Sequence, residues 1–243
     1  MIITNDTPEL LRAAARNNAV WCDAVCRGHG PAGEFAPDAW TSARRTPPLY
    51  PDAVSLTRDA SAAALVAAID TGSPGCSVKD SFAVLDLAPA GFEVLFEAQW
   101  IHRPAGSPGS AGSLGAVGSR LEWSEVSGAE ELAAWEAAWD GEESTGLFHP
   151  GLPGGDIVFL AGRAGGRIVA GAVASTGGGV VGVSNLFAHD DGDVDATWAA
   201  VLAGIAARWP DLPVVGYEHG EDLDAAVRAG FTAIGPLRIW LHV

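Results

Sequence analysis

The spacing of apolar and polar residues in the second half of the chain predicts short strands and helices in regular succession. Two stretches of alternating and apolar residues flank Gly165-Gly166, which is a hairpin signal. Trp135 and Trp139 lie four residues apart, on one face of a predicted helix. We expect strands over residues 120–126, 156–164, 167–176, 179–188, 214–219 and 231–243, and helices over 128–141, 195–209 and 221–230. The order is β-α-β-β-β-α-β-α-β.

The first half has a less regular pattern. Residues 7–26 have helical spacing, with Thr7 as the N-cap and Pro8 in the first turn. We expect strands over residues 51–57, 76–82 and 92–103, and helices over 59–72 and 83–91. Further strands before residue 51 are hard to find in this half. It therefore has the character of a shortened α/β unit.

A segment without helical or strand period separates the halves. Residues 103–119 consist mainly of Gly, Ser, Ala and Pro, a composition typical of linkers. We therefore predict a partial domain over residues 1–105, a flexible linker over 106–119 and a fuller domain over 120–243.

The two halves also resemble each other. An offset of 139 residues relates Pro74 to Pro213 and Gly91 to Gly230, and it also aligns the Phe after each glycine. The helices that precede these segments align at the same offset. Identity is low, so the order of elements carries more weight than the matched letters. We interpret the chain as a tandem repeat of one α/β unit.

Composition narrows the expected partners. The chain has 14 basic and 30 acidic residues, a net charge of −16, with 48% hydrophobic residues. Such a charge repels phosphate backbones and anionic lipid, so we expect no nucleic-acid or membrane partner and a cationic small molecule as the ligand that it favours. A role in solubility alone would also explain the negative net charge. With no secretory or membrane-spanning apolar run, the expected location is the cytoplasm, and homodimerisation is left open.

The element order after the linker resembles the GCN5-related N-acetyltransferase (GNAT) family. The resemblance covers about residues 120–243 and rests on "GRAGGRIVAGAVAS" as a hairpin, "VGVSNLFA" before a turn and helix, and "AVRAGFTAIGPLRIWL" at the end. It implies an α/β fold with a mixed sheet, in tandem with a partial N-terminal unit. It also implies acetyl-CoA as co-substrate, held by the main chain of the fourth strand and by the following loop. The residues at these positions are Asn185, Leu186, Phe187, Ala188, His189, Gly192 and Val194.

Two positions depart from the family pattern. The pyrophosphate loop usually reads Arg/Gln-x-x-Gly-x-Gly/Ala, but His189 to Val194 keeps only Gly192 and carries three aspartates. Negative charge at a helix N-terminus opposes anion binding, and Asp193 or Asp195 is then better explained as a helix cap. The tyrosine that the family often places four residues before the Gly-Phe pair is replaced by Ala226.

The strand over residues 214–219 carries the candidates for catalysis. Glu218 or His219 would serve as the base that removes a proton from an amine, and Tyr217 as a substitute acid for the thiolate. Strand alternation sends Tyr217 and His219 to one face and Glu218 to the other, so the three are not expected to converge. A structural role at the edge of the core is the competing explanation.

Cys22, Cys26 and His29 have spacings that would place them along one helical face. A zinc site would need a fourth ligand, so buried cysteines are the preferred interpretation and no metal is expected. The nine tryptophans are explained first by packing.

The function expected from the resemblance is transfer of an acetyl or other acyl group from CoA to a small cationic amine. The alternative is a non-catalytic GNAT-like protein that uses the cleft for another ligand or for a protein.

Overall fold

The computed structural model describes residues 7–30, 32–107, 121–141, 143–189 and 193–243. Their elements are α1 (Thr7–Arg27), β1 (Glu34–Phe35), β2 (Ala39–Thr41), β3 (Ala53–Ser55), α2 (Ala62–Ala67), β4 (Ser77–Asp80), η1 (Ala88–Ala90), β5 (Phe92–Arg103), β6 (Glu122–Glu125), α3 (Ala129–Asp140), β7 (Ile157–Ala164), β8 (Arg167–Gly177), β9 (Val180–Ala188), α4 (Val194–Arg208), β10 (Val214–Glu218), α5 (Gly220–Arg228) and β11 (Thr232–His242). Every element predicted after the linker is present.

The first half departs from the predicted pattern in three places. The helix predicted over residues 59–72 is limited to the six residues of α2, and the one over 83–91 is the three-residue 3-10 turn η1. Pro89 in η1 and the left-handed Gly91 that follows it end the turn before an α-helix can form. β1 and β2 were not predicted, because two or three residues are too few to show a period. Most of the predicted linker lies outside the described residues.

All described strands join one mixed sheet in the order β1-β2-β3-β4-β11-β5-β10-β9-β8-β7-β6. β5, from the first half, lies between β10 and β11 of the second, and β11 lies between β5 and β4. The pairs β3–β4 and β9–β10 are parallel, and all the other pairs are antiparallel. The β5–β11 pair therefore lies in the middle of the sheet, with four strands beyond β11, five beyond β5, and one parallel pair on each side.

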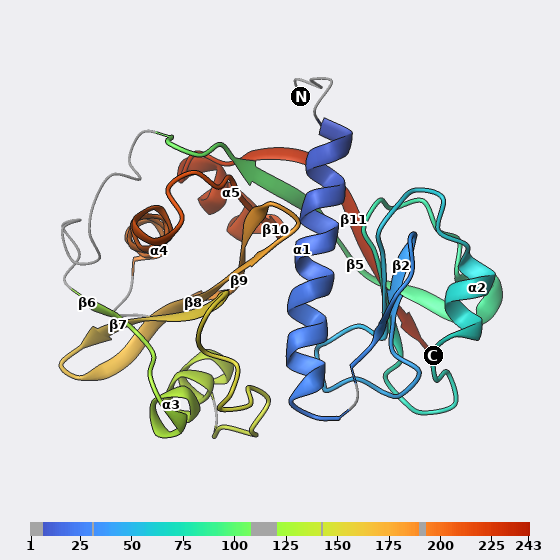
Figure 1. Ribbon diagram of the computed structural model, residues 1–243, viewed down its shortest axis with the longest axis horizontal. Coiled ribbons are helices and arrows are strands. Elements are labelled where there is room, and N and C mark those ends of the chain that lie inside the picture. The colour runs from blue at the N-terminus through green and yellow to red at the C-terminus, as the bar shows by residue number, and fades with distance from the viewer. Residues whose placement is uncertain (1–6, 31, 108–120, 142, 190–192) are drawn as a thin grey trace.

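Helices cover both faces of the second half of the sheet. α4 and α5 bury Trp198, Ile205 and Ala226 against one face, and α1 and α3 bury Trp21 and Trp135 against the other. Figure 1 shows α1 in the middle of the molecule, between the β6–β10 region and the smaller first half. Among the described residues, no helix has both the length and the apolar character needed to cross a bilayer.

The contact between α1 and the β8–β9 hairpin is close and polar. Asn17 is 3% exposed, and its Nδ2 donates to the carbonyl oxygen of Ser175 at 2.9 Å. A Cβ at Gly182 would overlap Asn17 Oδ1, so the strand can approach the helix only because this residue is glycine. α1 also contacts β3, β5, β10 and β11, so its position is tied to both halves.

We predict that Gly182→Ala lowers the free energy of unfolding by about 1–3 kcal/mol, because the added methyl overlaps the buried Asn17 side chain and displaces it from its hydrogen bond to Ser175. Urea denaturation followed by tryptophan fluorescence would measure the loss. Gly72→Ala is the matched control, since its Cβ would meet only Asp70 Oδ1 at an ordinary 3.4 Å. Equal stability of Gly182→Ala and wild type would contradict the close approach.

Candidate functional site

The parallel strands β9 and β10 separate after a short contact. They pair only at Val181–Val214 and Gly182–Val215. Beyond this point β9 bends away at an irregularity in its pairing with β8, where Asn185 has a φ of 52°. Asparagine tolerates this left-handed conformation better than most residues. The edge of β9 after Gly182 therefore faces a gap instead of a neighbouring strand.

A cavity of about 310 Å³, the splay cavity, lies at this gap. Both halves of the chain line it. The first half contributes Asn18, Trp21 and Cys22 from α1, Leu49, Tyr50 and Pro51 from a loop, and Lys79 from β4. The second half contributes Trp139 from α3, Val183, Ser184, Asn185 and Leu186 from β9, and Tyr217 and Glu218 from β10. The site thus depends on the sheet that joins the halves.

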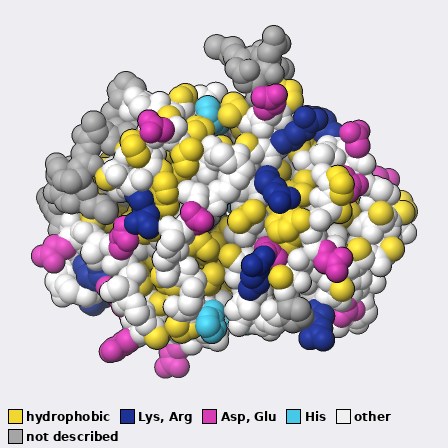
Figure 2. Space-filling view, in the orientation of Figure 1, with side chains coloured by type: hydrophobic (Ala, Val, Ile, Leu, Met, Phe, Trp, Pro, Cys, Tyr) yellow, Lys and Arg dark blue, Asp and Glu magenta, His cyan; other side chains and the backbone are white. Residues whose placement is uncertain are grey.

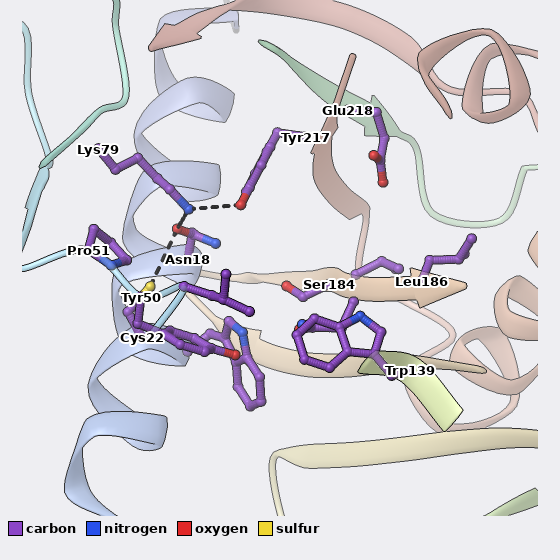
Figure 3. Close-up of a pocket in the computed structure, with 14 residues that line it drawn as sticks. Asn18, Cys22, Tyr50, Pro51, Lys79, Trp139, Ser184, Leu186, Tyr217 and Glu218 are labelled. Atoms are coloured by element: carbon purple, nitrogen blue, oxygen red, sulfur yellow. Dashed lines mark hydrogen bonds between the residues drawn. The ribbon is translucent and has the colours of Figure 1, made fainter. Parts of the chain in front are cut away.

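Tyr217 and Glu218 both border the splay cavity, although they are neighbours on one strand (Figure 3). The rings of Tyr217 and His219 pack against Trp100 and Phe96 of β5, in keeping with the expected grouping of these two residues on one face of β10. The strands part here, so the cavity reaches both faces of β10. His219 is the N-cap residue of α5, does not line the cavity, and packs its ring against Phe96 at a centroid distance of 5.3 Å.

Burial gives the Glu218 carboxyl an unusual affinity for its proton. Desolvation, with a smaller effect from the nearby Asp222 carboxylate, raises the pKa of Glu218 to about 8. A carboxyl with a pKa near neutral pH can accept a proton from a weakly acidic group and release it again. Perturbed pKa values of this kind are common at functional sites.

Lys79 is the single lysine of the sequence and is only 3% exposed. Its Nζ donates to Asn18 Oδ1 at 2.7 Å and to Tyr217 Oη at 3.1 Å, as the dashed lines of Figure 3 show. Within the described part of the chain, no carboxylate forms an ion pair with this ammonium group. An ammonium has three N–H donors, so one remains after these two bonds.

The N-terminus of α4 is capped from within the chain. The Asp193 side chain accepts from the backbone N–H groups of Asp195 and Ala196, which confirms Asp193 as the helix cap. Asp195 instead makes a bidentate pair with Arg228, which lowers the pKa of the Asp195 carboxyl. Two of the donors that an anion would use are therefore occupied by a carboxylate.

The residues expected to hold a cofactor fall into three groups. Asn185 and Leu186 line the splay cavity. The Phe187 ring packs against Trp135, Ala188 pairs with Ala170 of β8, and the His189 ring contacts the carbonyl oxygen of Ala138. Val194 is the first residue of α4, and Gly192, with Asp190 and Asp191, lies outside the described residues.

The cysteine cluster is buried and forms no metal site in the described residues, where no group of three potential ligands occurs. α1 ends at Arg27, so His29 leaves the helix face, and its Nε2 contacts the carbonyl oxygen of Leu147 at 2.8 Å. Burial raises the pKa of the Cys22 thiol and raises that of Cys26 to about 12. Thiols with raised pKa values are poor nucleophiles.

The acidic residues do not gather into one patch on the face that carries α1. In Figure 2 the Asp and Glu side chains are scattered over this face, among neutral and basic groups. Glu218 is the sole acidic residue among those that line the splay cavity. The net charge of −16 is therefore a property of the surface more than of the site.

Several residues of the cavity were not predicted as site residues: Asn18, Trp21, Tyr50, Lys79 and Trp139. One signal was available, because the sequence places its single lysine within a predicted strand. Tyr50 lies in a Pro-rich stretch that shows no period, and nothing local marks it.

Comparison with solved structures supports the fold. A GCN5-related N-acetyltransferase from Kribbella flavida matches with a TM-score of 0.59 and 14% identity, over 92% of this chain and 95% of that one. A GNAT-family protein from Novosphingobium aromaticivorans matches with a TM-score of 0.61 and 16% identity, over 94% and 97%. No protein-family model and no curated protein sequence matches. At these identities the likeness shows a GNAT-like α/β fold across most of the chain.

We predict that Glu218→Gln changes how stability depends on pH. The folded-state pKa of about 8 exceeds the ordinary 4.5, so between these values the folded chain holds a proton that the unfolded chain has lost. The wild-type free energy of unfolding therefore falls as pH rises through this interval, relative to the variant, and the difference levels off above it. Urea denaturation from about pH 5 to about pH 9 would measure it. Glu122→Gln, at an exposed strand position, is the control, and a difference independent of pH would contradict the shifted pKa.

Proposed function

We propose that this protein is an N-acyltransferase that moves an acetyl or other acyl group from CoA to a small amine bound in the splay cavity. The observation that carries the proposal is the separation of β9 and β10, with the Glu218 carboxyl and the Tyr217 hydroxyl at the gap. The GNAT-like fold of the whole chain supports it.

The proposed reaction assigns each group a role. The amine nitrogen attacks the thioester carbonyl, so that a C–N bond forms and the C–S bond breaks. Glu218, as carboxylate, takes the proton that the amine loses, and Tyr217 gives a proton to the sulfur that leaves. Glu218 is suited to its role because its pKa of about 8 lies near a neutral working pH.

The edge of β9 is the proposed support for the acyl donor. Its residues from Val183 onward have no pairing with β10, so their backbone groups on that edge are available to an extended ligand. By the resemblance, this is the strand whose main chain holds the pantetheine arm and thioester. Trp139 and Leu186 border the same space and would give the arm an apolar wall.

We also propose that the first half is a partial second copy of the same α/β unit. The strand order supports this, because each half has a parallel pair followed by the last strand of the other half. In this arrangement the two copies exchange their last strands, β5 and β11. The 139-residue offset between Gly91 and Gly230 agrees with it.

Two observations favour a second candidate, a non-catalytic protein that uses the cleft for another ligand. Asp193 occupies donors at the N-terminus of α4, where the family binds pyrophosphate. Ala226, at the position of the family tyrosine, is completely buried in the core. Binding of the acyl donor separates the two candidates.

We predict that acetyl-CoA raises the thermal stability of the protein and that ATP does not. Ligand at one hundred times its dissociation constant stabilises the native state by about 2.7 kcal/mol. Differential scanning fluorimetry and calorimetry would measure the effect, and thiol release in the presence of a panel of amines would test transfer. Glu218→Gln should then lower turnover by about 100-fold or more. Absence of any shift with millimolar acetyl-CoA would favour the second candidate.

We predict that Asp193→Asn strengthens CoA binding about two- to fivefold, because asparagine still caps α4 but carries no charge. Asp211→Asn, an exposed residue just beyond the other end of the helix, makes the same change of net charge and is the control. Calorimetric titration with CoA would measure both. Equal affinities of Asp193→Asn and wild type would show that this carboxylate does not oppose the ligand.

A further inference from the structure

A second cavity, of about 540 Å³, lies beside the splay cavity and is largely apolar. We call it the apolar cavity. β5 and β11 contribute Phe96, Ile239 and Leu241 to its wall, and the Pro-rich loop before β3 closes another side. Its volume is in the range of sites that hold small organic molecules.

The two cavities meet at a shared wall. Tyr50, Lys79 and Tyr217, with Leu49 and Pro51, border both of them. A ligand at this wall can therefore extend into either space. In the view of Figure 3, Tyr217 lies between Lys79 on one side and Glu218 on the other.

The charge of the apolar cavity is opposite to that of the protein. Arg45 and Lys79 are its charged residues, and no acidic residue is among the described residues that line it. The charge of Arg45 is balanced by the buried Asp52, with which it forms an ion pair, and Arg45 also donates to the carbonyl oxygens of Pro74 and Gly75. Lys79 has no carboxylate partner in the described residues: it donates to the neutral Asn18 and Tyr217, and its Nζ lies 4.2 Å from the centroid of the Tyr217 ring.

Tyr50 also borders the shared wall and is 6% exposed. Its ring packs edge-on against Trp21 at a centroid distance of 6.2 Å, and burial raises the pKa of its hydroxyl. A bound molecule at this wall would use the remaining N–H donor of Lys79.

We propose that the apolar cavity binds a small organic acid, whose carboxylate is held by Lys79 Nζ and whose apolar body packs on Phe96, Ile239 and Leu241. A monoanion fits better than a phosphate, because one ammonium without a carboxylate partner balances one negative charge in an apolar surrounding. The inference does not depend on acyl transfer. Joined to the proposed function, it names the acceptor as an amine that also carries a carboxylate and an apolar group, such as an apolar α-amino acid.

The negative net charge of the whole chain suggested a cationic ligand, whereas the residues that line the two cavities favour a ligand with an anionic group. Lys79 lies in a buried site, where its charge is screened less than the surface carboxylates are. A bound amine without a carboxylate would leave the ammonium unbalanced.

Calorimetric titration without acyl-CoA tests the proposal with three probes of one shape: 3-phenylpropionate, 3-phenylpropan-1-ol and 3-phenylpropylamine. We expect the acid to bind about tenfold or more tightly than the alcohol, and the amine to bind more weakly than the alcohol. Lys79→Met should remove the preference for the acid and leave the affinity for the alcohol within about twofold, because methionine keeps the apolar stem.

Two further variants keep the test decisive if Lys79→Met does not fold. Lys79→Arg should retain a preference for the acid, and Ile239→Trp should weaken the acid and the alcohol alike by filling the cavity. Arg238→Met is the control, because it removes one positive charge from the neighbouring position of β11, where Arg238 pairs with Glu97 outside the cavity.

Three outcomes would overturn the proposal: no binding of the acid to wild type, equal binding of acid and alcohol, or an acid preference that survives in Lys79→Met. Because no CoA is present, none of them bears on whether the protein transfers an acyl group. A failure of acetyl-CoA to bind would likewise leave this inference standing.

Discussion

The pairing of β5 on both of its edges is the constraint on which the rest of the structure depends. β5 pairs with β11 from Phe92 to His102 and with β10 from Gln99 to Arg103. Because β10 is held by β5 along its whole length, it can leave β9 after two residue pairs without losing its place in the sheet. The same strand brings the first half of the chain, and with it Lys79, alongside Tyr217. The gap and the groups that line it are therefore consequences of the pairing of β5 with both β10 and β11.

Helix α1 completes the site from the other side. Its contact with β8 and β9, through Asn17 and Gly182, fixes the position and rotation of the helix, and with them the side chains that follow Asn17. Asn18 then accepts from Lys79, and Cys22 lies one turn further along the cavity wall. Two buried amides, those of Asn17 and Asn18, thus connect the helix to the second and the first half, so the halves cannot shift independently without breaking buried polar contacts.

The electrostatics of the site differ from those of the surface. Acidic residues dominate the chain, yet the two cavities contain Lys79, Arg45 and a Glu218 whose pKa is raised toward neutrality by burial. The N-terminus of α4 shows the opposite arrangement, since Asp193 places a carboxylate where an anion would bind. The two cavities are therefore better equipped for an anionic group than the N-terminus of α4 is.

The sequence by itself determined most of the secondary structure. The spacing of apolar residues, glycine turns and caps are local signals. They located the hairpin at Gly165-Gly166 and each element from β6 to β11, and they limited the cap of α4 to Asp193 or Asp195. The short strands β1 and β2 were not predicted, because two or three residues are too few to show an alternating pattern.

Only the tertiary structure decided which strands are neighbours and which side chains share a cavity. The insertion of β5 between β10 and β11 joins residues more than one hundred positions apart, and no local pattern specifies that choice. Alternation along a strand separates Tyr217 from Glu218, and only the opening of the sheet lets one cavity reach both of them. Lys79 and Tyr50 became site residues for the same reason: their role comes from what packs around them, which the residues next to them in the chain do not determine.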